Sequence, residues 1–465
     1  MDQEHQPILS TQLPTRLRAK HEVAVLAALG GPIVITQILQ MATVVLDVVM
    51  SGRASAVDLA GVSVGASLWV PVFLFSLGLL MALTPIVAHA NGARRYEQIA
   101  PAVFQSFWIA LVVMTLTVFI LRNTEAILVL MNVNKEIKPV ALGYLHAISF
   151  GMPAIIAYNV LRFYADGLSM TRPAMVTSIV GLLVNAPLNY VLIYGKFGFP
   201  ELGGVGCGWA SAVALWVSFL FMAGYVFFVK NFRKTWLFQR FYAPDWPQIK
   251  ELLKLGLPIG FMYLVESSVF SVIALFLSAY GAQVVASHQI ALNVASLVFM
   301  VPLSVSLATS IRVGFLLGAN QPVAARFSSY TGVGLTFAYG AASGLGLWYF
   351  ADFITALYTP AAAVQAIAAE LLTFAAVFQL ADAIQVTSVG ALRGYKDTKV
   401  PMLIMIISFW VFSLPLGYAL GMTDWFGHSW KAKGFWTGLL VGLTLAAILI
   451  SIRLHKISQK ALQST

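Results

Sequence analysis

Long apolar stretches separated by short polar segments make up most of this chain. Twelve of them lie at roughly 23–50, 58–91, 99–121, 139–165, 173–195, 206–230, 251–280, 284–317, 327–350, 362–393, 400–421 and 434–455. Each reaches the ~20 residues that a helix needs to cross a bilayer, and none alternates like a membrane strand. The pattern predicts an all-α integral membrane protein with about twelve transmembrane helices.

Composition excludes a water-soluble fold. Hydrophobic residues make up 59% of the chain and charged residues 10%, and the mean hydropathy is +0.84. Soluble domains are closer to half apolar and a quarter charged. The net charge of +10 arises from Lys and Arg in the short loops, so we expect no nucleic-acid partner. Cys207 is the only cysteine, which excludes an intrachain disulfide.

The basic residues also predict orientation. With both termini in the cytoplasm, 20 Lys and Arg residues fall on the cytoplasmic side and 7 on the outer side. This bias is typical of cytoplasmic loops. Residues 1–22 are polar and basic without a short apolar core, so we interpret them as a cytoplasmic tail and not as a signal peptide. Residues 456–465 form the second predicted tail.

The two halves of the chain repeat one another. Residues 30–33 (GGPI) recur 226 positions later as residues 256–259 (GLPI), and residues 187–190 (PLNY) are paralleled 228 positions later by residues 415–418 (PLGY). We predict two pseudo-symmetric six-helix bundles, 23–230 and 250–455, joined by a cytoplasmic linker at 231–249. Paired bundles of equal orientation that face a central cleft are typical of secondary transporters.

Three acidic residues lie inside the predicted spans: Asp47, Glu266 and Asp382. A carboxylate at bilayer depth costs a few kcal/mol even on insertion scales. No Lys or Arg occurs at a similar depth in the sequence, so each acid is expected to take up a proton or attract a cation. The structural alternative is that each one only forms hydrogen bonds between helices.

Polar neighbours accompany Asp47. Gln40 and Thr43 precede it at a spacing that places all three residues on one helical face. Asn185 and Asn189 are four residues apart in the fifth span and also share a face. Their carbonyl oxygens and the Asp47 carboxylate are candidate Na+ ligands, because hard cations prefer oxygen. Hydrogen bonding between helices is an equally good reading of the two asparagines.

The second half has its own polar stripe. Gln379, Asp382 and Gln385 follow one another at three-residue spacing in the tenth span, and Glu266 lies in the middle of the seventh. We expect such residues to face a protein interior or a watery cavity instead of lipid.

Enzymatic activity is not expected. Residues 61–65 (GVSVG) match the nucleophile elbow of hydrolases, but they lie within an apolar helix and lack the strand before the turn. The stretch reads better as a small-residue helix contact. The sequence holds neither a Walker A loop nor a zinc-protease motif.

Several longer motifs resemble the bacterial NorM-type branch of the multidrug and toxic compound extrusion (MATE) family. They are residues 47–52 (DVVMSG), 187–195 (PLNYVLIYG), 203–208 (GGVGCG), 256–259 (GLPI), 285–289 (VASHQ) and 392–397 (LRGYKD). The resemblance covers essentially the whole chain. It implies a V-shaped pair of six-helix bundles in the bacterial inner membrane that exchange Na+ or H+ for bulky, often cationic compounds.

The resemblance also implies roles for particular residues. The family's first-helix acid falls on Asp47, and its first-half asparagines fall on Asn185 and Asn189. Its second-half acids, linked to cation binding, fall on Glu266 and Asp382. A Na+ site is therefore expected either at Glu266 and Asp382 or at Asp47 with the two asparagines. The usual Asp-Thr pair after the first helix is Asp47-Val48 here.

The sequence thus predicts a secondary active multidrug antiporter. Its expected substrates are cationic amphiphiles such as fluoroquinolones and ethidium-like dyes, and it needs no cofactor beyond the coupling ion, Na+ or H+. One alternative is a flippase for lipid-linked oligosaccharides, which needs basic residues in the central cleft. The other is a membrane-embedded enzyme, which needs a clustered catalytic set.

Overall fold

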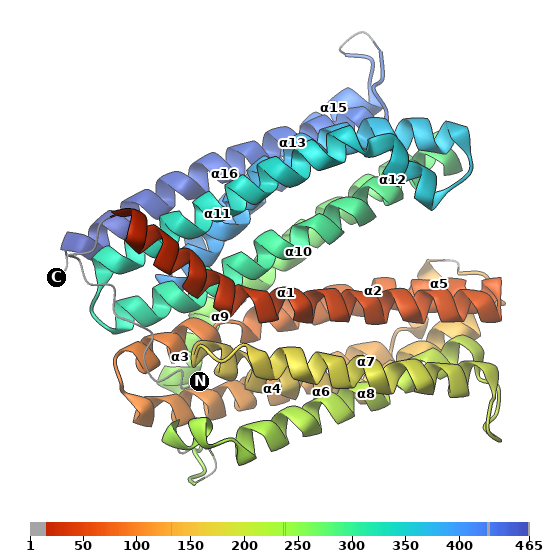
Figure 1. The fold of residues 1–465 in the computed structure, drawn as a ribbon. Coiled ribbons are helices and arrows are strands. Elements are labelled where there is room, and N and C mark those ends of the chain that lie inside the picture. The colour runs from red at the N-terminus through yellow and green to blue at the C-terminus, as the bar shows by residue number, and fades with distance from the viewer. Residues whose placement is uncertain (1–14, 132, 236, 238, 426–427, 464–465) are drawn as a thin grey trace. The chain divides into compact units, whose positions relative to one another are not determined.

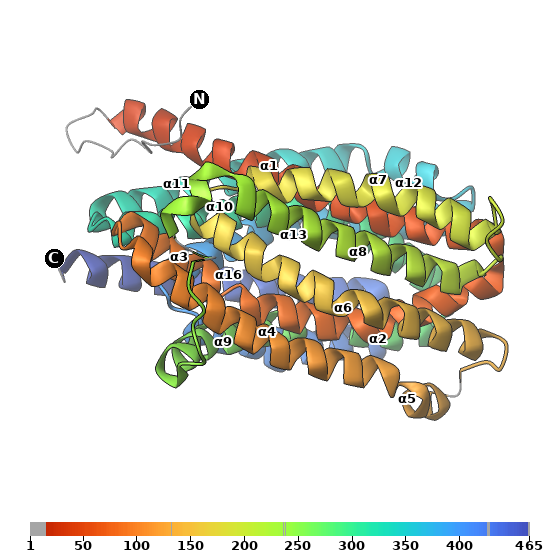
Figure 2. The ribbon, with the colours of Figure 1, turned by 90° about the horizontal axis from the view of Figure 1, so that it is seen from below.

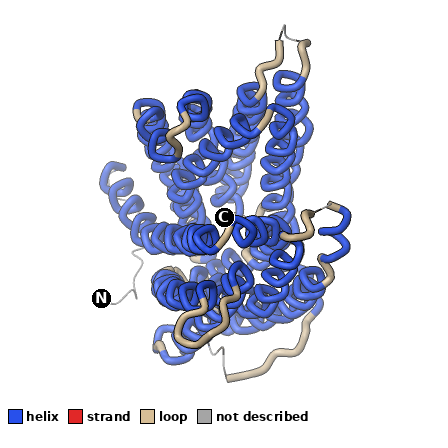
Figure 3. Tube along the Cα trace, turned by 90° about the vertical axis from the view of Figure 1, so that its right-hand side faces the viewer, coloured by secondary structure: helices blue, strands red, loops and turns tan. Residues whose placement is uncertain are grey.

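The computed structural model describes residues 15–463 except 132, 236, 238 and 426–427. Figure 3 shows helices joined by loops, with no strand in this described part of the chain. The long helices are α1 (Thr15–Ala54), α2 (Ala56–Leu80), α4 (Ile99–Arg122), α6 (Ile137–Gly167), α7 (Arg172–Tyr194), α8 (Gly203–Phe228), α9 (Trp246–Leu277), α10 (Ala282–Gly318), α11 (Pro322–Tyr349), α13 (Ala362–Gly394) and α16 (Ala432–Gln463).

Shorter elements complete the order. They are α3 (Leu83–Gly92), α5 (Glu125–Leu130), α12 (Ala351–Tyr358), α14 (Lys399–Ile406) and α15 (Leu414–Met422), with 3-10 turns η1 (Tyr96–Gln98), η2 (Lys230–Thr235) and η3 (Ser278–Tyr280). Between α14 and α15 the helix continues through a π-helical segment, Ile407–Ser413.

Eleven helical segments of the described residues are long and apolar enough to cross a membrane. All eleven coincide with predicted spans. The remaining predicted span, 327–350, corresponds to α11, which is long enough but less apolar because it contains many serine, threonine and glycine residues. Its Ser328, Ser329 and Thr336 are fully buried, so these hydroxyls face protein. With α11, the described helices agree with the prediction of about twelve.

The chain divides into two compact units, one formed by Pro32–Ser267 and the other by Met1–Gly31 with Ser268–Thr465. In the first unit α6 is central, because it packs against α2, α4 and α8, while α7 packs on α8. Figures 1 and 2 show α4, α6 and α8 running side by side. Every residue of α6 from Ile156 to Gly167 is buried.

In the other unit α13 holds the corresponding place. It packs against α10, α11 and α16, and α15 packs on α16. Residues 381–383 and 385–394 of α13 are all buried. The predicted repeat aligns α6 with α13, so the most enclosed helix of each unit comes from the same position of the repeat.

Both unit boundaries fall inside helices, at the first helix of each half. The start of α1 belongs with α10, where the fully buried Glu22 and Arg312 form an ion pair of 2.9 Å. The first part of α9 belongs with α2, where Phe261 contacts the ring of Phe75 at 5.4 Å between centroids. Glu22 was assigned to the predicted tail of residues 1–22, but α1 already begins at Thr15.

Candidate functional site

Asp47 lies at the centre of a polar cluster within the unit Pro32–Ser267. The side-chain amide of Asn189 donates to its Oδ1 at 2.5 Å, and the hydroxyl of Ser211 donates to its Oδ2 at 3.0 Å. These partners come from α7 and α8, whereas Asp47 belongs to α1. The donors are neutral, so they orient the carboxylate without neutralising its charge.

The two asparagines extend this cluster along α7. Asn189 Nδ2 donates to Asn185 Oδ1 at 2.9 Å, and Asn185 Nδ2 donates to Ser211 Oγ at 3.3 Å. Both amides are buried, and Asn189 Oδ1 has no hydrogen-bond partner among the described residues. A buried carbonyl oxygen left open beside a carboxylate is an oxygen-donor arrangement suited to a hard cation.

Hydrogen bonds at helix ends connect α8 to the turn between α1 and α2. Ser55 caps α2, since its Oγ accepts from Asp58 N at 2.9 Å. Asp58 Oδ1 in turn accepts from Gly204 N at 2.6 Å, at the start of α8. A carboxylate is favourable at a helix N-terminus, where backbone N–H groups are unpaired. Asp58 thus joins the start of α2, just after the end of α1, to the α8 helix that carries Ser211.

The end of α7 is fixed as well. Tyr194 donates its hydroxyl to the carbonyl of Met50 at 2.9 Å, which ties α7 to the end of α1. Gly195 then ends α7 in the left-handed conformation, with φ +62°. The helix carrying both asparagines is therefore held against the helix carrying Asp47.

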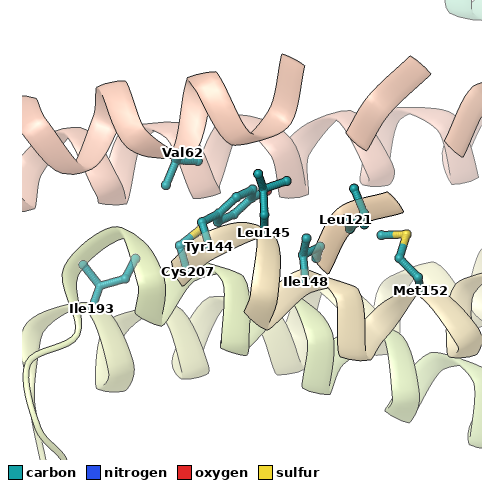
Figure 4. Packing of buried hydrophobic residues seen from close by; sticks show 8 residues of the cluster. All are labelled: Val62, Leu121, Tyr144, Leu145, Ile148, Met152, Ile193 and Cys207. Carbon is teal, nitrogen blue, oxygen red and sulfur yellow. The ribbon is translucent and has the colours of Figure 1, made fainter. Parts of the chain in front are cut away.

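An apolar core packs beside the polar cluster. Figure 4 shows its buried members, Val62, Leu121, Tyr144, Leu145, Ile148, Met152, Ile193 and Cys207. Cys207, from the same helix as Ser211, lies beside the Asp47 carboxylate. Tyr144 accepts a hydrogen bond from Trp69 Nε1 at 3.2 Å. Close packing of this kind leaves the polar side chains few alternative positions.

Gln40 and Thr43 are less engaged than Asp47. Both are partly exposed, and the Thr43 hydroxyl donates to the Leu39 carbonyl of its own helix at 3.0 Å. The structure therefore joins Asp47 to Asn185 and Asn189, while Thr43 bonds within α1.

Glu266 stands apart from this cluster, in α9. Among the residues that the structure describes, its carboxylate forms no hydrogen bond or ion pair. It belongs to the same unit as Asp47, whereas Asp382 belongs to the other unit. A Na+ site shared by Glu266 and Asp382 stays a prediction.

The stripe on α13 is entirely buried, with Gln379 1%, Asp382 4% and Gln385 4% exposed. Gln379 Nε2 donates to the Ala295 carbonyl of α10 at 3.4 Å, while Gln385 Nε2 lies 3.0 Å from the sulfur of Met405 in α14. Steps of three residues turn by about 300°, so the stripe winds around the helix. The two glutamines face different neighbouring helices as a result.

Sequence reasoning missed Ser211. It lies among small apolar residues of α8, where a serine gives no signal of its own. His288 is buried, as expected for a packed interior histidine, but its partner was not predicted: it accepts from Trp436 Nε1 at 3.1 Å. Within the described residues, no group of three or more His, Cys, Asp and Glu side chains is placed to hold a metal ion.

Comparison with known proteins decides the family. The MatE family model matches the chain twice, at residues 32–191 and at residues 258–419. The chain belongs to the MatE family. The two matches begin 226 positions apart and end 228 positions apart, the same offsets that the sequence repeat gives. The predicted duplication is confirmed.

Curated MatE relatives align over nearly the whole chain. Probable multidrug resistance protein NorM of Idiomarina loihiensis is 42% identical, with 95% of this chain and 96% of the relative covered. Multidrug resistance protein PmpM of Pseudomonas aeruginosa is 45% identical, over 96% and 93%. Multidrug resistance protein MdtK of Yersinia pseudotuberculosis is 44% identical, over 93% and 95%. The resemblance to the NorM-type branch is confirmed.

Solved structures confirm the fold. The eukaryotic MATE transporter AtDTX14 superposes with a TM-score of 0.85 at 19% identity, covering 96% of this chain and 99% of that one. An outward-facing multidrug resistance MATE family transporter of the MOP superfamily gives 0.85 at 20% identity, covering 94% and 96%. The chain is a multi-pass membrane protein of a transporter family, and the family is not one of enzymes.

Proposed function

We propose that this MatE protein is a secondary active antiporter that exports cationic amphiphilic drugs and dyes in exchange for Na+ or H+. The names of its relatives support the multidrug part of this proposal, since NorM, PmpM and MdtK are all called multidrug resistance proteins. The ion-coupled part depends on the chemistry of Asp47.

The observation that carries the proposal is the bonding of the Asp47 carboxylate. It lies in a membrane-spanning helix, and among the described residues it accepts hydrogen bonds from the neutral amide of Asn189 and the neutral hydroxyl of Ser211. Its negative charge therefore remains uncompensated until a proton or a Na+ ion binds. The open Asn189 Oδ1 offers a further oxygen ligand to Na+.

Charge exchange follows from this arrangement. While Asp47 is ionised, it favours an organic cation nearby, because opposite charges attract strongly in a low dielectric. Loading of a proton or Na+ removes that attraction and favours release of the drug. An inward ion gradient would then drive the export of fluoroquinolones or ethidium-like dyes.

The proposed location is the bacterial inner membrane, with both termini in the cytoplasm. Its support is the excess of Lys and Arg on the side of the termini. Membrane lipid is then the main surrounding partner. No resident cofactor enters the proposed mechanism, because the coupling ion is itself a transported species.

An oligosaccharide flippase is less well supported. Such a protein needs cationic side chains to bind a pyrophosphate. Two buried arginines are instead engaged with acids: Arg312 pairs with Glu22 at 2.9 Å, and Arg162 lies 3.7 Å from Asp166. The cationic groups needed to hold an anionic substrate are thus already neutralised at these positions.

The test is ethidium accumulation in an efflux-deficient bacterium that expresses the wild type or Asp47→Asn. We expect the variant to lose about 90% of the efflux rate at equal expression, since asparagine can bind neither a proton nor a cation as carboxylate does. Glu97→Gln, a change of an exposed acid in η1, is the matched control and should leave efflux unchanged. Wild-type efflux by Asp47→Asn would overturn the proposed coupling role.

A further inference from the structure

A second feature of the unit Pro32–Ser267 lies away from the Asp47 cluster. It is a cavity of about 430 Å³ between α4, α6, α8 and the segment after η2. Its lining includes Phe104, Trp108, Leu161, Phe219, Ala223 and Phe241. All of the lining residues are aromatic or aliphatic, so the cavity offers water almost no hydrogen bonds and suits a hydrocarbon.

The linker forms a fixed wall of this cavity. Trp108 Nε1 donates to the Tyr242 carbonyl at 3.2 Å, and Gln105 Nε2 donates to the Ala243 carbonyl at 3.0 Å. The ring of Phe241 meets that of Trp108 edge-on, with 6.0 Å between centroids. The linker is therefore bonded to α4 over several consecutive residues, and the wall belongs to the folded unit.

The cavity borders the apolar surface that α4 exposes. Leu111, which lines it, is 48% exposed, and its neighbours Val112 and Leu116 on α4 are 59% and 56% exposed. Leu220 on α8, next to the lining residue Phe219, is 60% exposed. Both helices are membrane-spanning by length and composition. An acyl chain of the bilayer can therefore reach the cavity without crossing a polar surface.

The linker that forms the cavity wall is also basic, and its exposed cationic residues are termed the basic rim. The exposed residues Lys230, Arg233, Lys234 and Arg240 all come from residues 230–240, directly before Phe241. Basic clusters at the cytoplasmic end of membrane helices attract anionic lipid headgroups. The same charges repel a cationic drug, so the rim and the apolar lining together select an anionic amphiphile.

We propose that this cavity holds one acyl chain of an anionic phospholipid, with the phosphate headgroup placed at the basic rim. The inference is independent of the export mechanism, because the cavity shares no residue with the Asp47 cluster. It assigns a lipid-binding role to the linker between the two repeats.

Native mass spectrometry of the purified protein, titrated with phosphatidylglycerol or phosphatidylethanolamine, tests the site. Ala223→Phe places a ring in the cavity, and we expect it to lower phosphatidylglycerol binding roughly tenfold. Gly224→Phe is the matched control, because a Cβ at Gly224 would meet nothing within 4 Å and Gly224 does not line the cavity. The double variant Arg233→Gln/Arg240→Gln should abolish the preference for phosphatidylglycerol over phosphatidylethanolamine.

A second readout does not depend on filling the cavity. Phosphatidylglycerol with brominated acyl chains should quench wild-type tryptophan fluorescence more than that of Trp108→Phe, because Trp108 lines the cavity. Equal binding by Ala223→Phe and wild type, or equal quenching of wild type and Trp108→Phe, would overturn the proposal. The proposal would also be overturned if ethidium bound more tightly than phosphatidylglycerol and Ala223→Phe removed that ethidium binding.

Discussion

Asn189 donates its side-chain amide to Asp47 at 2.5 Å, although the two residues are 142 positions apart in the chain. The bond brings an amide of α7 to a carboxylate of α1, and Ser211 of α8 donates to the other carboxylate oxygen. Three helices therefore meet at one ionisable group. The consequences can be measured residue by residue.

The first prediction concerns the coupling between Asn189 and Asp47. Asn189→Ala removes one donor from the carboxylate, and we expect efflux to fall at least about tenfold, by analogy with the loss of one hydrogen bond to a charged group. When Asn189→Ala is added to Asp47→Asn, we expect almost no further loss of efflux, because the charged acceptor is already gone. Ethidium efflux of the two single variants and the double variant forms the cycle. Additive losses would show that the two side chains act separately.

The second prediction concerns the other acids. Glu266→Gln and Asp382→Asn should each lower norfloxacin efflux at least severalfold at unchanged expression, since both replace an ionisable group in a membrane-spanning helix. Asp352→Asn changes an exposed acid in α12 and serves as the control. Full efflux from both variants would restrict ion coupling to the Asp47 cluster.

The third prediction concerns stability. Glu22→Gln leaves the fully buried Arg312 guanidinium without its carboxylate and should destabilise the protein by about 3–5 kcal/mol, seen as a lower Tm in detergent. The double variant Glu22→Leu/Arg312→Met should recover most of the loss, because apolar residues can replace a buried pair. Glu125→Gln breaks the exposed pair with Lys138 and should change Tm little. A Tm for Glu22→Gln equal to that of Glu125→Gln would contradict the structural role of the buried pair.

The fourth prediction concerns the close approach of α9 to α2. A Cβ at Gly260 would lie 2.8 Å from the Phe75 carbonyl oxygen, which belongs to backbone and cannot swing away. Gly260→Val should therefore destabilise the protein by about 1–3 kcal/mol through overpacking. Gly224→Val has the same intrinsic helix cost but open space around it. Similar thermal unfolding of the two valine variants would argue against the tight helix contact.

The sequence pattern predicted the spans and the repeat well for a physical reason. Lipid requires long apolar helices, and their lengths can be read directly from the chain. The predicted stretches 99–121 and 362–393 begin at the same residues as α4 and α13 and end one residue earlier. The short elements α5 and α12 were not predicted, since six to eight residues give too weak a periodic signal.

The candidate site was only partly predictable. Asp47, Asn185 and Asn189 carry a visible signal because charged and amide side chains are costly in apolar helices. Ser211 carries none, and its role depends on how α8 is placed by Asp58. The pairing of Glu22 with Arg312 joins residues 290 positions apart, which no local pattern encodes. The division of α1 and α9 between the two units likewise follows from tertiary packing.

Ion-driven export through Asp47 is tested most directly in proteoliposomes. Ethidium transport would be followed while an inward Na+ gradient or an inward proton gradient is imposed, one at a time. We predict that at least one gradient accelerates transport about tenfold or more in the wild type and leaves Asp47→Asn at the rate without a gradient. Equal rates with and without both gradients, or unchanged acceleration in Asp47→Asn, would contradict the mechanism.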